Sequence, residues 1–319
     1  MPVTKIPRPD RAEWLKIRRS YIGGSDAAAV CGLNPYVSPY SLWCEKKGIT
    51  PDFAGNLATD VGEYLEEFIA KRFESETGKK VRRNNFCIFN SEYPWAMADI
   101  DRELVGEDAG LECKSTSALN MRQYKGGAYP AKFYAQCVHY LAVTGKLRWY
   151  LAVLIGNSDF KVFCIERADA QEDIDALMAS EKDFSEVMQG DTPPAVDGSE
   201  ATDTALRQQG LSADLDEETV IDLTEREELL DQYFALKAQS EALAKQADAI
   251  KQQIMQDMTE NVYARTPRYK ISYKPQERKT FDWRAMKKNY PALDFDPFFK
   301  VSRSRVMKIE SVEAQNAEA

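Results

Sequence analysis

The stretch AMADIDRELVGEDAGLECKST, residues 96–116, decides the fold that we expect for this chain. Its first part, residues 96–101, alternates between apolar and polar positions and predicts a half-buried strand that ends at Asp101. Residues 111–116 predict a second strand, and the glycines and aspartates between the two runs are typical of turns. The stretch therefore predicts a β-hairpin with an aspartate at the end of one strand.

Three side chains of this hairpin carry the chemistry. Residues two apart in a strand share a face, so we expect Glu112 and Lys114 to lie together while Cys113 faces the core. Pairing of the strands would bring Asp101, or its rival Asp99 on the same strand face, beside Glu112. Two such carboxylates repel each other unless a cation lies between them, and oxygen ligands favour Mg²⁺. Lys114 could then orient or deprotonate an attacking water, or stabilise negative charge.

Helical patterns flank the hairpin on both sides. Upstream, residues 61–73 have apolar positions at helical spacing, and Glu66 is either a third acidic ligand or a solvated surface residue. Downstream, the proline and glycine at the two ends of residues 130–145 predict a helix that carries Gln136 and His139 one turn apart. The sequence leaves the role of His139 open.

Five segments occur in the order known from one protein family. They are RRSYIGGSD (residues 18–26), Gly62-x-x-Leu65-Glu66, Asp101, Glu112-x-Lys114 and Pro130-x-x-x-Tyr134-x-Gln136. Over roughly residues 12–190 the chain resembles the YqaJ-type phage recombinase family, within the lambda exonuclease branch of the PD-(D/E)xK nucleases. One departure is that Ile100 stands where the motif name has a proline. The resemblance alone favours Asp101 over Asp99 as the ligand.

The resemblance implies a metal site built from this hairpin. The implied Mg²⁺ ligands are Asp101, Glu112, Glu66 and the backbone carbonyl of Cys113. Two ions are implied, and Mn²⁺ can substitute for Mg²⁺. Lys114 would be the catalytic lysine, acting with Asp101 and Glu112, and Gln136 would help to position the lysine or the scissile phosphate.

A second implied site binds the end of the substrate strand. Arg18 and Ser25 match the pair that holds the 5′-terminal phosphate in the family. A guanidinium, a hydroxyl and the backbone N–H groups of a Gly-Gly loop before a helix suit an anion. Arg19 competes with Arg18 for this role. Residues 23–26 could also be a simple helix start with Ser25 or Asp26 as the N-cap.

Composition narrows the class of protein. The 319 residues have a formal net charge of −9, and the six cysteines form no Cys-x-x-Cys pair. Zinc and iron–sulfur sites are therefore not expected. The sequence has no Gly-x-x-x-x-Gly-Lys-Ser/Thr phosphate loop, so we expect no helicase motor in this chain. It also has no signal-peptide pattern and no run of 18 apolar residues, which predicts a cytoplasmic protein without membrane contact.

The net charge hides a strong polarity along the chain. Residues 191–231 contain 13 acidic and 2 basic residues, whereas residues 261–310 contain 13 basic and 5 acidic residues. The pattern predicts five regions with different properties. They are an exonuclease core over 1–195, an acidic linker over 196–225, a heptad-patterned helix over 226–260, a basic module over 261–310 and a disordered tail over 311–319.

The two C-terminal regions offer alternatives. The heptad positions are Leu229, Leu236, Leu243 and Ile250, with Tyr233, Ala247 and Ile254 at the other seam position. They favour either a short coiled coil or helical hairpin between subunits, or a helix that lies on its own domain. In the basic module, residues 269–274 predict a strand and residues 278–281 its hairpin partner. With Arg303 and Arg305, this module would either bind DNA or form a solvated surface.

The combined interpretation is an α/β fold with a restriction-endonuclease-like PD-(D/E)xK core, a central mixed sheet flanked by helices, and a C-terminal extension of helix and β-hairpin. The resemblance implies a Mg²⁺-dependent 5′ to 3′ exonuclease that acts on double-stranded DNA ends with a 5′-phosphate, releases mononucleotides and leaves 3′ single-stranded tails. It also implies a trimeric ring, a single-strand annealing partner of the RecT or Redβ type, and a phage or prophage protein in the cytoplasm of a bacterial host. Two rivals are a restriction-like or structure-specific endonuclease, and a non-catalytic adaptor for DNA ends or the annealing partner.

Overall fold

The structure is a computed structural model that divides into two compact units. It describes residues 3–51, 55–209, 220–290, 294 and 307–309. The first unit comprises residues 1–213 with 303–319, and the second comprises residues 214–302. Each unit is described by itself below.

The first unit is a mixed α/β structure with two mixed sheets. The strands are β1 (Val3–Pro7), β2 (Ile22–Gly23), β3 (Val81–Arg83), β4 (Phe86–Asn90), β5 (Ala96–Ala98), β6 (Arg102–Leu104), β7 (Ala109–Thr116), β8 (Arg148–Ile155) and β9 (Asp159–Glu166). One sheet has the order β1-β4-β5-β2 and the other β3-β6-β7-β8-β9. The pairs β2–β5 and β7–β8 are parallel, whereas the remaining pairs in both sheets are antiparallel. The single central sheet expected from the sequence is therefore two sheets.

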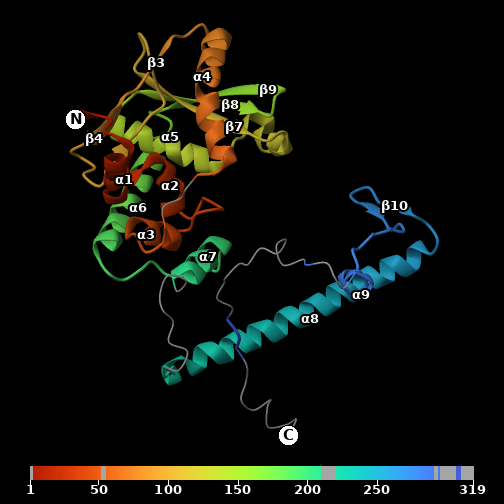
Figure 1. The fold of residues 1–319 in the computed structure, drawn as a ribbon. Helices are drawn as coiled ribbons and strands as arrows, with labels where there is room; N and C mark the ends of the chain where they lie inside the picture. Colours follow the sequence, from red (N-terminus) through yellow and green to blue (C-terminus); the bar gives the residue numbers. More distant parts are fainter. Residues whose placement is uncertain (1–2, 52–54, 210–219, 291–293, 295–306, 310–319) are drawn as a thin grey trace. The chain divides into compact units, whose positions relative to one another are not determined.

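Helices cover both faces of the five-stranded sheet (Figure 1). The helices of this unit are α1 (Arg11–Ser20), α2 (Gly24–Val30), α3 (Pro39–Lys46), α4 (Leu57–Thr77), α5 (Ala131–Thr144), α6 (Gln171–Gln189) and α7 (Glu200–Gln209), with a 3₁₀ segment η1 at Ala118–Gly127. Strand β8 alternates between the two faces, because Trp149 and Leu151 pack in the core under α5 while Tyr150 and Ala152 pack with Phe73 of α4. The sheet that carries Glu112 therefore lies between α4 and α5.

The predicted hairpin exists, but its first strand was placed wrongly. Strand β5 ends at Ala98 and belongs to the four-stranded sheet, so β7 pairs instead with β6, with Arg102 opposite Leu111. The backbone between β5 and β6 makes other hydrogen bonds, since the carbonyl of Asp99 accepts one from the Tyr140 hydroxyl at 3.0 Å. Asp101 consequently lies in the connection that leads from one sheet to the other.

Part of the range expected as an acidic linker is helical. Within residues 196–225, α7 packs against α3, and Thr202 and Ala205 are buried in that contact. The hydroxyls of Thr202 and Ser38 lie 2.7 Å apart. Small side chains spaced three apart thus attach this segment to the first unit despite its acidic composition.

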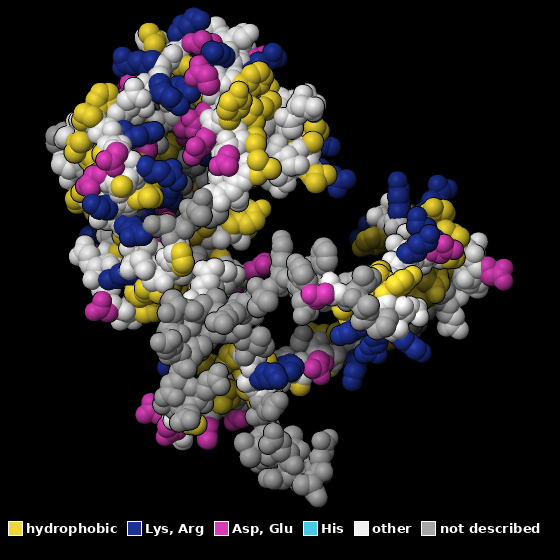
Figure 2. Space-filling model, viewed as in Figure 1, with side chains coloured by type: hydrophobic (Ala, Val, Ile, Leu, Met, Phe, Trp, Pro, Cys, Tyr) yellow, Lys and Arg dark blue, Asp and Glu magenta, His cyan; other side chains and the backbone are white. Residues whose placement is uncertain are grey.

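The second unit contains the heptad-patterned helix and the basic hairpin. Its elements are η2 (Thr224–Arg226), α8 (Glu227–Met258), β10 (Tyr263–Arg265), β11 (Lys270–Ser272) and α9 (Trp283–Asn289). The helix agrees with the prediction for residues 226–260, and its heptad leucines are exposed, Leu236 by 65%. Figure 2 shows Lys and Arg side chains gathered over β10, β11 and α9.

The predicted hairpin partner in this unit was wrong. Strand β11 pairs with β10, not with residues 278–281, because Thr266 starts a tight turn in which its hydroxyl accepts from the N–H of Tyr269 at 2.9 Å. Arg303, Arg305 and the predicted tail over 311–319 lie outside the described residues. Of the helices in the described ranges, none combines the length and apolar character that a membrane crossing needs.

Candidate active site

Strand β7 presents Glu112 and Lys114 on the side of the sheet that α5 covers. Glu112 is 2% exposed, and the Lys114 Nζ atom lies 2.6 Å from its Oε1 atom. Cys113 points to the opposite side, where its buried side chain packs with Ile69 and Phe73 of α4. The alternation of the strand produces this division, as the sequence predicts.

Asp101 reaches the same place from the connection between the sheets. Its Oδ2 atom accepts a hydrogen bond from the backbone N–H of Cys113 at 2.8 Å. Asp99, the rival ligand, is engaged elsewhere, since its carboxylate pairs with Arg8 and accepts from the Trp14 indole N–H at 3.0 Å. The structure therefore brings Asp101, and not Asp99, to Glu112 and Lys114.

Burial and mutual repulsion dominate the electrostatics of this cluster. Burial, followed by the charge of Asp101, raises the pKa of Glu112 to about 8. Burial also raises the pKa of Asp101. Burial alone would lower the pKa of Lys114, but the two carboxylates together raise it. The lysine is thus held as an ammonium between two acids.

Glu66 approaches the cluster from α4. Burial and the charge of Asp101 raise its pKa to about 7, and its carboxylate lies 3.8 Å from the Arg102 guanidinium. Its neighbour Glu67 has a side chain that is 60% exposed, which agrees with a surface position. Sequence reasoning missed Arg102, whose side chain is 3% exposed and whose partner Glu67 on α4 lies 35 residues away in the chain.

Helix α5 contributes Gln136 and Tyr140 from one face. The Gln136 amide donates to Glu112 Oε1 at 2.7 Å and to the Tyr140 hydroxyl at 2.9 Å. Tyr140 in turn donates to the carbonyl of Asp99. Sequence reasoning assigned Gln136 to this site but missed Tyr140, although the spacing of four residues in a helix places the two on one face.

The donor set fits a hard divalent cation. Glu112 Oε2 is buried and, among the described residues, has no hydrogen-bond partner. In the same part of the chain, no three His, Cys, Asp or Glu side chains converge as a ready-made metal cage. Mg²⁺ does not require such a cage, because it is usually held by one or two carboxylates together with water and substrate phosphate. Asp101 and Glu112 meet that requirement.

Arg18 and Ser25 both contact the carboxylate of Asp26. Sequence reasoning did not predict Asp26 as their partner. The Arg18 guanidinium and the Ser25 hydroxyl each lie 3.5 Å from Oδ1 of Asp26. The other oxygen of Asp26 pairs with Lys46 at 2.6 Å, and these two side chains are 4% and 1% exposed. Burial alone would raise the pKa of Asp26, but Lys46 and Arg18 together lower it. Arg19, the competing candidate, is exposed.

Asp26 also explains the start of α2. Gly23 is the N-cap, and its backbone N–H donates to Asp26 Oδ2 at 3.0 Å, so neither Ser25 nor Asp26 caps the helix. The next position, 24, requires glycine because the Tyr140 ring occupies the space that a side chain would need. The nearest ring atom, Cε1, would lie 2.4 Å from an ideal Cβ atom at that position. This contact joins α2, which carries Ser25 and Asp26, to α5, which carries Gln136.

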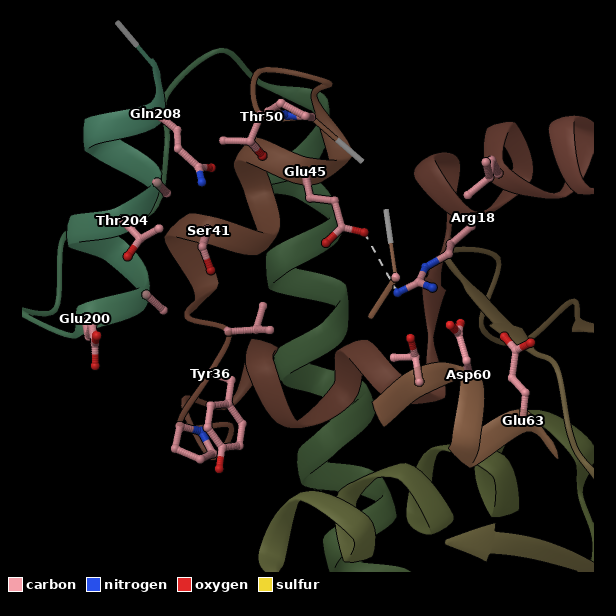
Figure 3. A pocket seen from close by; sticks show the side chains of 18 of the residues that line it. Arg18, Tyr36, Ser41, Glu45, Thr50, Asp60, Glu63, Glu200, Thr204 and Gln208 are labelled. Carbon is pink, nitrogen blue, oxygen red and sulfur yellow. Dashed lines mark ion pairs between the residues drawn. The ribbon is translucent and has the colours of Figure 1, made fainter. Parts of the chain in front are cut away.

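A cleft of about 1120 Å³ opens beside Arg18 (Figure 3). It is lined by α1, α3, the first turns of α4, and α7, and Figure 3 shows Arg18 directed at Glu45 across it. Asp101, Glu112 and Lys114 do not line this cleft. Glu63 does, and it lies one turn before Glu66 on α4. The cleft therefore adjoins the end of the acidic cluster without containing it.

His139 has a structural role, because both nitrogens of its ring contact other elements of the core. Its Nε2 atom lies 3.0 Å from the Met97 carbonyl, which can only accept, so Nε2 carries a proton. Its Nδ1 atom lies 2.7 Å from Glu181 of α6, and both side chains are fully buried. The pair therefore shares one proton and connects α5, α6 and β5. No part of the acidic cluster contacts it through a hydrogen bond that the described residues contain.

Comparison with known proteins identifies the family. The model of the YqaJ-like viral recombinase domain matches residues 13–147. The uncharacterized protein YqaJ of Bacillus subtilis (strain 168) is 37% identical over 294 residues, 91% of each chain. An alkaline exonuclease (LHK-Exo) from Laribacter hongkongensis has a TM-score of 0.43 at 19% identity, covering 56% of this chain and 96% of that one. A putative exonuclease from Eubacterium rectale has a TM-score of 0.44 at 12% identity, covering 68% and 97%. The family model and the identity to the Bacillus protein show that this chain belongs to the YqaJ-like viral recombinase family.

Proposed function

We propose that this protein is a Mg²⁺-dependent exonuclease that degrades one strand of double-stranded DNA from its 5′ end. It would release mononucleotides and leave 3′ single-stranded tails for recombination by strand annealing. The observation that carries the proposal is the cluster of Asp101, Glu112 and Lys114, in which Glu112 is buried and one of its carboxylate oxygens has no partner among the described residues. We assign the first unit to the restriction-endonuclease-like PD-(D/E)xK fold on the same basis.

The metal site follows from the donors. Asp101 and Glu112 would hold the ion with the Cys113 carbonyl, and Glu66 would complete the acidic cluster. When bound, Mg²⁺ supplies Lewis-acid stabilisation of the phosphate and activation of water. The raised pKa values of Glu112 and Glu66, about 8 and 7, support this role, because a nearby dication favours the charged form of each carboxylate.

Lys114 acts as a charge in this scheme. The neighbouring carboxylates raise its pKa and so favour the ammonium form. The ammonium would donate hydrogen bonds to the attacking water or to the phosphate oxygens as negative charge develops. Gln136 would keep Glu112 in place through its contact at 2.7 Å, with Tyr140 fixing the amide in turn.

Arg18 and Ser25 would bind the 5′-terminal phosphate. Both side chains converge on Asp26, which orients the guanidinium while leaving its side chain 32% exposed to a ligand. A charge-assisted bond from Arg18 and a hydroxyl donor from Ser25 suit a phosphate. This site distinguishes an exonuclease from an endonuclease, which needs no strand end.

Family membership supports the biological setting of the proposal. A phage or prophage recombination enzyme would act in the host cytoplasm beside a single-strand annealing protein of the RecT or Redβ type. A homotrimeric ring around DNA would account for processive digestion. The basic surface over β10, β11 and α9 would contact the DNA backbone or the partner.

An end-labelled linear duplex tests the activity. Digestion should require Mg²⁺ or Mn²⁺, stop with EDTA, release mononucleotides, and run faster from a 5′-phosphate than from a 5′-hydroxyl. A closed circular duplex should stay intact, and its cleavage would favour the endonuclease instead. Lys114→Ala should reduce digestion by several orders of magnitude while DNA binding persists, whereas unchanged digestion would favour the adaptor.

Neighbouring residues provide matched controls for the assigned roles. Asp101→Asn should abolish digestion, and Glu66→Gln should reduce it more than Glu67→Gln, because Glu67 is a surface residue. Arg18→Ala should remove the preference for a 5′-phosphate, while Arg19→Ala should retain it. An equal effect of the two arginine variants would contradict the assignment of the end site.

A further inference from the structure

A row of alternating aromatic rings and ammonium groups leads away from Lys114. The Lys114 Nζ atom lies 5.5 Å from the centre of the Phe133 ring. Lys132 Nζ lies 5.1 Å from the same ring and 4.8 Å from the ring of Tyr36. Each distance is within the range of a cation–π contact. The row therefore runs from the active-site lysine to the wall of the cleft, which Tyr36 lines (Figure 3).

Lys132 differs from Lys114 in the charges that surround it. Among the residues that the structure describes, no carboxylate lies within ion-pair distance of its ammonium group, although the side chain is partly buried. Burial and the charge of Lys114 lower its pKa. Two ammonium groups therefore flank Phe133, and only Lys114 has carboxylate partners in the described part of the chain. An anion beside Lys132 would relieve this imbalance.

Tyr36 differs from the aromatic residues of the core in its exposure and in its position on a loop. It is 76% exposed and lies in the loop between α2 and α3, whereas Phe133, in the first turn of α5, is partly buried against the core. The backbone N–H of Tyr36 donates to the Asn34 side chain at 3.0 Å, which fixes the loop at this point. An exposed ring on an anchored loop, with a cation over one face and the other face open, is an arrangement that can stack a nucleobase.

We propose that Tyr36 and Lys132 form a nucleotide-binding subsite next to the cleavage centre. Tyr36 would stack on an unpaired base of the strand being degraded, and Lys132 would bind a phosphate of the same strand. The inference rests on the proposed nuclease function and names where that strand lies beside Lys114. A base must leave the double helix to expose its face to Tyr36, so the subsite takes single-stranded DNA near the strand end.

The charges that line the cleft limit how far the subsite can extend. Four acidic residues, Glu45, Asp60, Glu63 and Glu200, line the cleft with two arginines, Arg11 and Arg18. Figure 3 shows Asp60 and Glu63 on the side of Arg18, and Glu200 with Tyr36 on the opposite side. A DNA backbone filling the whole cleft would meet these carboxylates. The subsite is therefore limited to the place where Lys132 and Tyr36 meet, and does not extend along the whole cleft.

Fluorescence of 2-aminopurine tests the subsite without cleavage. The probe is a 5′-phosphorylated duplex with 2-aminopurine at the first, second or third position of that strand, bound in Ca²⁺ in place of Mg²⁺. Stacking on Tyr36 should quench at least one of the three positions in the wild-type complex. Tyr36→Ala should remove this quenching and weaken binding roughly 5- to 150-fold, the range for one stacked base. Tyr36→Trp should restore both.

Lys132 and an unrelated tyrosine complete the design. Lys132→Ala should weaken binding and reduce the slope of log Kd against log salt by about one, as expected for the loss of one phosphate contact, and Lys132→Arg should keep the slope. Tyr64→Ala is the matched control, since Tyr64 is 85% exposed on α4 and does not line the cleft. Thermal melting of each variant checks that the fold is retained.

The outcomes separate this inference from the proposed function. Quenching that depends on Tyr36 in a protein that never digests DNA would support the subsite and contradict the nuclease. Digestion with equal affinity and quenching for Tyr36→Ala and Tyr64→Ala would overturn the subsite alone. Absence of quenching at all three positions, or absence of DNA binding by the wild type, would also overturn the subsite.

Discussion

Replacing Asp26 with asparagine tests how the end site is held. The carboxylate of Asp26 contacts Lys46 at 2.6 Å inside the first unit, where the two side chains are 4% and 1% exposed. Removing one member of a buried ion pair leaves an uncompensated charge, which costs about 3–5 kcal/mol. Lys46 keeps two backbone acceptors, the carbonyls of Arg18 and Tyr21 at 2.7 and 2.8 Å. We therefore expect a loss near the lower end, about 3 kcal/mol of unfolding free energy.

Urea unfolding followed by tryptophan fluorescence measures this loss. Four of the five tryptophans, residues 14, 43, 95 and 149, lie in the first unit, so the signal reports mainly on the unit that contains the pair. Combining Asp26→Asn with Lys46→Met should recover part of the lost stability, because the unpaired charge is then absent. A loss of less than about 1 kcal/mol for Asp26→Asn would refute the reasoning, since that is the range of an exposed pair.

The contribution of Asp26 to the unfolding free energy should decrease as the pH falls. The folded-state pKa of Asp26 lies below its ordinary value of 3.8 because of Lys46 and Arg18. Its contribution to stability is therefore present above that ordinary value and is lost as the pH falls through the folded-state pKa. The difference in unfolding free energy between the wild type and Asp26→Asn should be full at pH 7 and should narrow below pH 3.8. The preference for a 5′-phosphate should also weaken in the variant, because Arg18 loses its orienting carboxylate.

Four further perturbations test other contacts. Gly24→Ala should destabilise the protein by about 1–3 kcal/mol in urea unfolding, because the new methyl group meets the Tyr140 ring, while Gly62→Ala, with open space around it, should not. Tyr140→Phe should lower the unfolding free energy by about 1–3 kcal/mol, since its hydroxyl bonds to the buried amide of Gln136 and to the partly buried carbonyl of Asp99, and should slow digestion without changing the DNA Kd. Mg²⁺ at 100 times its Kd should stabilise the wild type by about 2.7 kcal/mol, measured as a rise in Tm, and should raise the Tm of Glu112→Gln less. Removing residues 261–319 should weaken binding of DNA or the annealing partner more than it changes the rate per nucleotide, and unaltered affinity for both would contradict this.

Sequence predicts the parts of the site that depend on local spacing. The face shared by Glu112 and Lys114 follows from the period of a strand, and that of Gln136 and Tyr140 follows from the period of a helix. The partner of β7 did not follow in this way, because strand pairing depends on where the backbone groups around Asp99 find hydrogen bonds. Those bonds come from Tyr140, 41 residues later in the chain. Local periodicity contains no information about such a contact.

The other features that sequence reasoning did not predict depend on polar contacts between residues far apart in the chain. Asp26 and Lys46 are 20 residues apart, and Asp99 is 85 residues from Trp14. The charged character of each residue is visible in the sequence, but a charge on an amphipathic helix is usually solvated, so burial of the pair could not be inferred. The turn between β10 and β11 is different, because Thr266 before a proline is a local turn signal that points to the observed partner.

Helix α5 fixes the distance between the two parts of the proposed mechanism. Its residues contact three separate segments, with Gln136 on Glu112 of β7, Tyr140 on the backbone of Asp99, and His139 on the carbonyl of Met97. Helix α2 packs on α5 at Gly24, and Ser25 and Asp26 are the next two residues of α2. An enzyme that removes one nucleotide at a time needs a constant separation between the site that holds the strand end and the site that cleaves. Because no flexible side chain intervenes between α2 and α5 at Gly24, a displacement there would shift the end site relative to Glu112, and Gly24→Ala should therefore impair cleavage of 5′-phosphorylated ends more than it impairs DNA binding.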